Sequence, residues 1–294
     1  MPIKHFHRRQ AIASGVDLRI LPLGDSITWG EGSSDENGYR LALATLIKNG
    51  GNNVEYIGSV KSGAMPNNEN EGHGGFQILP VGVKGKPNYP ERPNVILLMA
   101  GANDIIFESD IENAPQRMGT VIGEIVTACP DAAVLIGTLL PLLNPQISSK
   151  TIGFNTVMMG IVWDFTQRGK KVALIDMGRV TASYIRRSDG IHPTDEGYAL
   201  IAAAWHDGIV EAGKKGWIQR PLPRHSQGQL QGQPNETSIS DDRPPIENDG
   251  SQRKNSIARE NTWILAQLMI YALILFGLVL IFRRIIISLL HRYR

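Results

Sequence analysis

The chain has 294 residues, of which 42% are hydrophobic and 20% charged, so it is long enough for one large or two medium domains with an ordinary core. Its formal net charge of +2 offers no basic surface for nucleic acid, and we expect no nucleic-acid partner. A single cysteine, Cys129, excludes an intramolecular disulfide and a cysteine-rich zinc site.

Residues 1–16 are predicted to be an N-terminal extension without the apolar run of a secretory signal peptide. From residue 17 to 217, short apolar runs alternate with segments of helical period, which is typical of βα units around a parallel sheet. The expected strands are Leu18–Leu23, Val54–Gly58, Val95–Met99, Ala133–Thr138 and Val172–Asp176. The expected helices are Tyr39–Lys48, Ile111–Ala128, Ile152–Arg168 and Asp195–Ala212. This pattern predicts a doubly wound α/β domain.

The long stretch from Ser62 to Pro93 is rich in glycine and asparagine and shows no clear period. A loop of this length in a compact domain is usually functional or mobile. We therefore expect a loop near the mouth of the site.

The C-terminal part changes composition. Residues 218–262 are rich in Gln, Pro, Asn, Ser and charge and are predicted to be a disordered linker. The segment Trp263–Phe282 is apolar except for Gln267, and its length matches a hydrocarbon core of roughly 30 Å. We expect a transmembrane helix there, followed by a short basic tail at 283–294. A buried core helix is the alternative, but a helix after such a linker has no core to join.

Basic residues are nearly balanced on the two sides of this segment and do not decide its orientation. Because no signal peptide is visible, we predict a tail-anchored membrane protein with a cytosolic domain and a lipid bilayer as partner. A glycan on Asn235, in an Asn-Glu-Thr sequence, would contradict that orientation.

A candidate nucleophile follows the first predicted strand, in Gly24-Asp25-Ser26-Ile27-Thr28. Ser26 is thereby placed at the carboxyl edge of the sheet, where open α/β folds bind ligands. Glycine, aspartate and serine also form ordinary strand-to-helix turns, so this run alone leaves both interpretations open.

A candidate base and its orienting acid lie in Asp189-Gly190-Ile191-His192, after the fifth predicted strand. This spacing allows the carboxylate to hold one imidazole nitrogen while the other faces a serine. The competing interpretation is a loop aspartate and a helix-capping histidine. We favour the catalytic one.

Acyl transfer also needs donors for the oxyanion. Asn103 follows the third predicted strand at the same sheet edge, and the Ser26 N–H lies at a helix start. The run Gly72-His73-Gly74-Gly75-Phe76 allows a close backbone approach, although alone it indicates only a flexible loop. Trp29 and Phe76 adjoin the predicted site, either shaping a substrate pocket or simply packing.

Together these motifs resemble the SGNH (GDSL-like) hydrolase superfamily across roughly the first 215 residues. The resemblance implies Ser26 as nucleophile and oxyanion donor, Gly75 and Asn103 as further donors, and Asp189 with His192 as acid and base. Leu23–Thr28, Glu71–Gly75 and Asp189–Pro193 look most like the third carbohydrate esterase family, typically secreted acetylxylan esterases. Pattern and resemblance together predict a three-layer α/β/α sandwich with a five-stranded parallel sheet of flavodoxin-like order.

We therefore expect a serine esterase that removes acetyl or other short acyl groups from a carbohydrate. The alternatives are a lipase-like or lysophospholipase-like esterase acting on membrane lipids, suggested only by the anchor, and a catalytically silent, membrane-tethered binding domain. Signatures of Walker loops, dinucleotide folds, nucleophile elbows and zinc proteases do not occur, so no cofactor or metal is expected.

Overall fold

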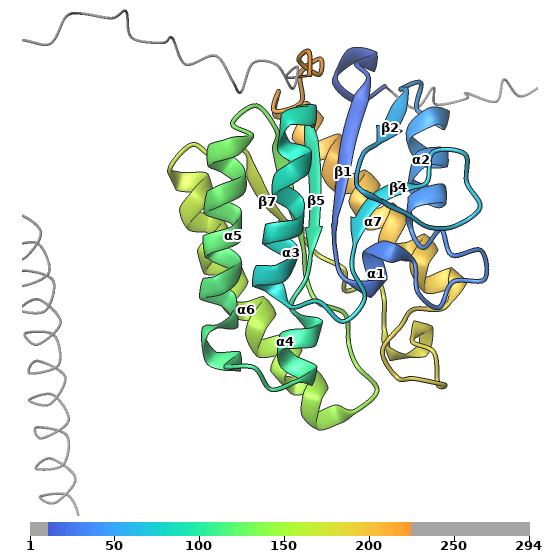
Figure 1. The fold of residues 1–294 in the computed structure, drawn as a ribbon, viewed down its shortest axis with the longest axis vertical. Coiled ribbons are helices and arrows are strands. Elements are labelled where there is room, and N and C mark those ends of the chain that lie inside the picture. The colour runs from blue at the N-terminus through green and yellow to red at the C-terminus, as the bar shows by residue number, and fades with distance from the viewer. Residues whose placement is uncertain (1–10, 225–294) are drawn as a thin grey trace, which may run out of the picture. The chain divides into compact units, whose positions relative to one another are not determined.

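The computed structural model describes residues 11–224, which form a sheet covered by helices on both faces (Figure 1). The seven strands follow the order β3-β4-β1-β5-β6-β7, and β2 also pairs with β1. All pairs are parallel except β3 with β4. The strands are β1 Leu18–Gly24, β2 Val54–Tyr56, β3 Val60–Lys61, β4 Glu69–Gly72, β5 Val95–Met99, β6 Ala133–Gly137 and β7 Val172–Ile175.

The described part of the chain contains seven α-helices, of which the last follows the final strand. They are α1 Ser26–Trp29, α2 Arg40–Asn49, α3 Ile78–Gly85, α4 Ala102–Ile106, α5 Ala114–Ala128, α6 Pro145–Gln167 and α7 Asp195–Lys214. Short 3-10 helices occur at Ile12–Gly15, Lys86–Glu91, Ile111–Asn113 and Ala182–Tyr184. The N-cap side chains of Asn144 and Thr194 accept backbone hydrogen bonds at the starts of α6 and α7.

The hydrophobic core has two parts, one on each face of the sheet, because side chains alternate between the faces along each strand. In β5, Val95 and Leu97 pack with α2 and α7, whereas Ile96 and Leu98 pack with α3, α5 and α6 on the opposite face. Successive residues of a strand point to opposite faces, so a continuous apolar strand supplies both cores. The three-layer arrangement is therefore a direct result of these buried strands.

The five predicted strands are present within one or two residues, and in space they follow the predicted flavodoxin-like order, β2-β1-β5-β6-β7. The prediction of only five strands was wrong, because β3 and β4 add to the sheet beside β1. Both lie in or next to the stretch 62–93, which is not an open loop: it also contains α3 and the 3-10 helix Lys86–Glu91. Strand β4 pairs with the end of β1, at Leu23 and Gly24.

The carboxyl ends of the parallel strands meet at one edge of the sheet, where α1 and α4 begin (Figure 1). Ser26 follows β1, His73 follows β4 and Asn103 follows β5, while His192 lies in the long connection from β7 to α7. A hydrogen bond of 3.0 Å from the His73 N–H to the Gly24 carbonyl joins two of these ends. All the candidate residues therefore come to the same edge.

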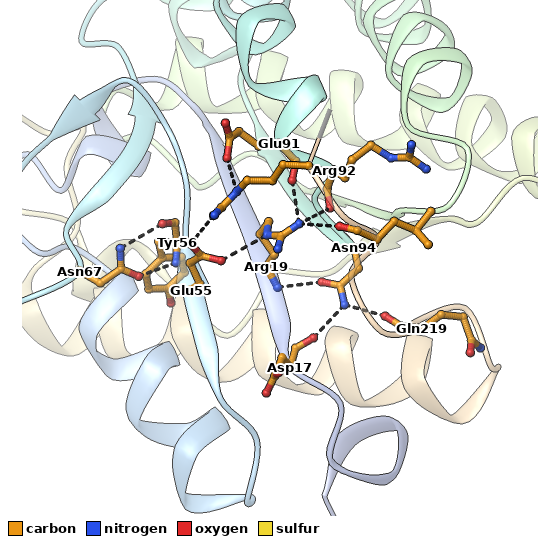
Figure 2. Close-up of polar contacts among 11 residues, drawn as sticks. Asp17, Arg19, Glu55, Tyr56, Asn67, Glu91, Arg92, Asn94 and Gln219 are labelled. Carbon is orange, nitrogen blue, oxygen red and sulfur yellow. Dashed lines mark hydrogen bonds and ion pairs between the residues drawn. The ribbon is translucent and has the colours of Figure 1, made fainter. Parts of the chain in front are cut away.

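The segment after α7 is attached to the opposite edge. Figure 2 shows the Asn94 carboxamide between two backbones: Nδ2 donates to the carbonyls of Asp17, at 3.0 Å, and Gln219, at 2.7 Å. The Arg19 guanidinium donates to the Leu222 carbonyl, and Ile218 is buried in the core. The chain thus leaves the described domain at the edge remote from Ser26.

The predicted membrane segment 263–282 and most of the predicted linker lie outside the described residues. Within residues 11–224, the structure contains no helix that is both long and apolar enough to cross a membrane.

Candidate active site

Ser26 and His192 form the centre of the site. Ser26 is the first residue of α1, is 7% exposed, and its Oγ lies 2.9 Å from Nε2 of His192. The Asp25 carboxylate caps this helix by accepting the Ile27 N–H at 3.0 Å, which fixes the turn that presents the serine. A hydroxyl and an imidazole nitrogen at this distance can exchange a proton.

Asp189 lies on the other side of the imidazole, with Oδ2 3.4 Å from Nδ1 of His192. Its second oxygen accepts the N–H groups of Ile191, at 2.8 Å, and His192, at 2.9 Å, so the carboxylate shapes the loop as well as facing the ring. Burial acts to raise the pKa of Asp189, but these hydrogen bonds and the nearby His192 outweigh it and lower the pKa below its ordinary value. The structure thus brings the three predicted residues into one chain of contacts.

Asn103 lies beside the turn after β4, Gly72-His73-Gly74-Gly75-Phe76, which we call the glycine turn. Nδ2 of Asn103 donates to the Phe76 carbonyl at 2.9 Å, and the Phe76 N–H closes the turn on the His73 carbonyl at 3.2 Å. Gly75 has φ +75°, a left-handed conformation that favours glycine at this position. Nδ2 carries a second hydrogen, so an oxyanion can be bound while the Phe76 contact remains.

A buried polar network supports this turn. The Glu71 side chain is fully buried and accepts hydrogen bonds from Ser59 N, Ser59 Oγ and Asn88 Nδ2 at 2.8, 2.9 and 2.7 Å. Nε2 of His73 lies 2.6 Å from the same carboxylate, and its ring stacks on Phe76 with centroids 5.0 Å apart. Phe76 therefore packs against His73, and the turn is anchored rather than flexible.

Sequence reasoning missed three acidic residues at this site. Glu71 and His73 are two residues apart, a spacing that places both on one face of an extended segment and could have revealed their pairing. Asp25 is 1% exposed, and burial raises its pKa to about 6. Glu31 faces the imidazole, with Oε2 3.6 Å from Nε2 of His192. The two residues are far apart in the sequence, and no motif predicts their contact.

Comparison with known proteins identifies the fold and family. A family profile described as GDSL-like Lipase/Acylhydrolase matches residues 23–200. The chain is 26% identical over 268 residues to a multidomain esterase of Ruminococcus flavefaciens; the match covers 81% of this chain but only 33% of that protein's length. This chain therefore spans about a third of that relative.

Among solved structures, a family 3 carbohydrate esterase of Clostridium thermocellum is similar, with a TM-score of 0.59 and 25% identity over 68% of this chain and 98% of that one. A family 3 carbohydrate esterase of Talaromyces cellulolyticus shares the fold with a TM-score of 0.58 and 20% identity, covering 67% and 99% of the two chains. The profile covers more than half of the sequence. The chain therefore belongs to the GDSL-like lipase/acylhydrolase family.

Proposed function

We propose that Ser26, His192 and Asp189 form a catalytic triad that hydrolyses esters through an acyl-enzyme. The observation that carries this proposal is the 2.9 Å contact between Ser26 Oγ and His192 Nε2, with Asp189 on the opposite ring nitrogen. Nε2 takes the Ser26 proton as Oγ attacks the ester carbonyl, and the resulting imidazolium returns that proton to the departing alcohol. Water then attacks the acyl-serine with His192 again as base, which releases the acid and free Ser26.

The tetrahedral oxyanion is bound, in this proposal, by the N–H groups of Ser26 and Gly75 and by Nδ2 of Asn103. Ser26 is the first residue of a helix, and an N–H there has no partner within the helix. Asn103 and the glycine turn are joined through Phe76, so the donors are positioned before substrate binds. Preorganised donors of this kind typically contribute about 2.7–4 kcal/mol each to lowering the barrier.

The proposed substrates are acetyl or other short acyl esters of carbohydrates. This choice is supported by the name of the solved relative from Clostridium thermocellum, a family 3 carbohydrate esterase at 25% identity. It is also supported by the glycine turn, which brings backbone rather than a bulky side chain close to Ser26.

The proposal is tested by measuring hydrolysis of p-nitrophenyl acetate, butyrate and palmitate, and release of acetate from acetylated xylan, by the full-length chain. We expect activity to fall as the acyl chain lengthens, and Ser26→Ala to lower kcat by at least about 10³-fold. Ser34→Ala removes an exposed hydroxyl from the next loop and is the matched control. A preference for palmitate would instead indicate a lipase-like enzyme, and unchanged activity of Ser26→Ala would refute the assignment.

A further inference from the structure

We propose that Glu31 determines which alcohols this esterase accepts. Its carboxylate receives a hydrogen bond from a hydroxyl group next to the esterified one, as found on a sugar ring, and disfavours an alcohol that carries a negative charge at that place. The inference rests on the proposed function, because it assigns Glu31 to the alcohol side of the same reaction.

The position of the carboxylate relative to the reacting atoms carries the argument. Oε2 of Glu31 lies 3.6 Å from Nε2 of His192, the same nitrogen that lies 2.9 Å from Ser26 Oγ. This nitrogen returns the proton to the departing alcohol in the proposed reaction. A group close to Nε2 is therefore next to the alcohol rather than the acyl part of the ester.

The glycine turn leaves room at this point. A Cβ atom placed on Gly74 would lie 3.6 Å from Glu31 Oε2 and 4.0 Å from Ser26 Cβ. Glu31, Ser26 and Gly74 thus border one small space that no side chain at position 74 occupies. A substituent on the carbon next to the ester has access to the carboxylate there.

The backbone of Glu31 is held on both sides. Its N–H donates to the Ser26 carbonyl at 2.9 Å, and its carbonyl accepts the hydroxyl of buried Tyr198 at 2.5 Å. The buried Arg40 guanidinium binds the loop on either side, at the carbonyls of Trp29, 2.9 Å away, and Glu36, 3.1 Å away. The carboxylate therefore projects from a fixed support.

The Glu31 side chain itself is open to a ligand. It is 53% exposed, and in the described part of the chain His192 is the only basic side chain within ion-pair distance of it. Arg186 approaches the same loop: a Cβ on Gly32 would be 2.8 Å from Arg186 Nη1 and 3.0 Å from His192 Cβ. Among the described residues Arg186 forms no ion pair with Glu31, so the carboxylate near Nε2 is available to an incoming alcohol.

The chemistry of a carboxylate selects for polyhydroxyl alcohols. An ionised acceptor makes stronger hydrogen bonds to hydroxyl donors than a neutral one, and it repels a second anion at the same distance. A neutral sugar ring presents hydroxyl donors on the carbons adjacent to its ester. Uronate-like or phosphate-bearing alcohols present a like charge instead.

Three matched acetates test this selection in the full-length protein: cyclohexyl acetate, trans-2-hydroxycyclohexyl acetate and trans-2-carboxycyclohexyl acetate. The readout is the ratio of kcat/KM values between two esters within each variant, so a general loss of activity cancels. For the wild type we expect kcat/KM for trans-2-hydroxycyclohexyl acetate to be about ten times that for cyclohexyl acetate, which we call the hydroxyl-to-plain ratio. Glu31→Ala should bring this ratio close to one, and Glu31→Gln, whose amide oxygen is a weaker acceptor, should give an intermediate value.

For the carboxyl ester we expect the substitutions to change the ratio in the opposite direction. The carboxyl-to-plain ratio is kcat/KM for trans-2-carboxycyclohexyl acetate divided by that for cyclohexyl acetate. Glu31→Gln and Glu31→Ala should both raise it several-fold, and 0.5 M salt should raise it in the wild type but not in these variants. Glu36→Gln, the same charge change at an exposed position of the same loop, should leave both ratios unchanged.

The outcomes separate this inference from the proposed function. Wild-type hydrolysis that survives Ser26→Ala would refute the proposed function. Ser26-dependent hydrolysis whose ratios are the same in wild type, Glu31→Gln and Glu31→Ala would overturn the role of Glu31 and leave the triad intact.

Discussion

His192 Nε2 lies 2.9 Å from Ser26 Oγ, although 166 positions of sequence separate the two residues. Replacing this histidine with alanine removes the proposed base without changing a backbone contact. We expect His192→Ala to lower kcat for p-nitrophenyl acetate by about 10³-fold or more, because general-base and general-acid steps both depend on it. The thermal midpoint should change little, which differential scanning calorimetry can check; wild-type kcat in a folded His192→Ala protein would contradict the assignment.

Asp189 has two roles that two substitutions separate. Asp189→Asn keeps an oxygen that can accept the Ile191 and His192 N–H groups but removes the negative charge beside Nδ1. We expect kcat to fall by about 10²–10⁴-fold while the fold is retained. Asp189→Ala should also loosen the loop, which would appear as faster amide hydrogen exchange near His192. Equal kcat for Asp189→Asn and wild type would show that the charge is not used.

The pKa of Asp189 gives this residue a defined pH dependence. Its folded-state pKa lies below the ordinary value, so its ionised form contributes stability above the unfolded pKa. That contribution is lost as pH falls through the folded pKa. Asp189→Asn should therefore be less stable than wild type at neutral pH, and the two proteins should converge in acid, as measured by urea unfolding.

Asn103 is expected to act in the transition state rather than in substrate binding. Asn103→Ala should lower kcat by about 10²–10³-fold and change KM far less, because the oxyanion exists only after attack. Steady-state kinetics on p-nitrophenyl acetate separates the two constants. Asn113→Ala, at an exposed position before α5, is a matched control, and a change confined to KM would contradict the oxyanion role.

The central strands were predictable because burial on both faces leaves an apolar signature. Strand β5 has five buried residues, Val-Ile-Leu-Leu-Met, and its predicted bounds are identical to the observed ones. Strand β4 was missed because its residues, Glu-Asn-Glu-Gly, look like a loop. Asn70 and Glu71 are nevertheless fully buried: Asn70 Oδ1 accepts the N–H of neighbouring Gly72, and the Glu71 carboxylate accepts hydrogen bonds from the more distant Ser59 and Asn88. Helix α3 was missed because Pro80, Gly82 and Gly85 disfavour a helix locally.

In the candidate site, too, some residues could be predicted from the sequence and others depend on contacts between distant segments. Ser26 could be singled out because it directly follows β1, and Asp189 with His192 because a short Asp-Gly-Ile-His motif in the connection from β7 to α7 suits an acid and a base. The contact of Glu31 with the imidazole depends on the path of the loop after α1, which is set by the buried Arg40 and Tyr198. Such three-dimensional supports leave no period in the sequence.

Glu71 is expected to stabilise the domain. Glu71→Ala leaves the donors of Ser59, Asn88 and His73 without their shared acceptor in a buried place. We expect a loss of about 3 kcal/mol in the free energy of unfolding, which corresponds to a drop of roughly 6–12 °C in Tm. Glu69→Ala, which removes only an exposed 3.5 Å pair with Lys61, should cost less than about 1 kcal/mol. Similar losses for the two variants would show that the network is not cooperative.

Asp25 should make the protein less stable as pH rises. Burial raises its pKa from 3.8 to about 6, despite the opposing hydrogen bond from the Ile27 N–H. Between these values the unfolded chain releases its proton before the folded one does, so the contribution of Asp25 to stability is complete below 3.8 and is lost as pH rises through 6. The whole effect is about 3 kcal/mol, of which roughly half falls between pH 5 and 8.

The test compares Asp25→Asn with wild type by urea unfolding at pH 5 and pH 8. The asparagine does not titrate, so any packing cost of its amide is the same at both pH values and cancels in the difference. We expect the stability of the variant relative to wild type to increase by about 1.5 kcal/mol at the higher pH. Because His192 interacts electrostatically with Asp25, the comparison is repeated with His192→Ala in both proteins. A relative stability that does not change with pH in either pair would show that Asp25 titrates in the folded state as it does in the unfolded chain.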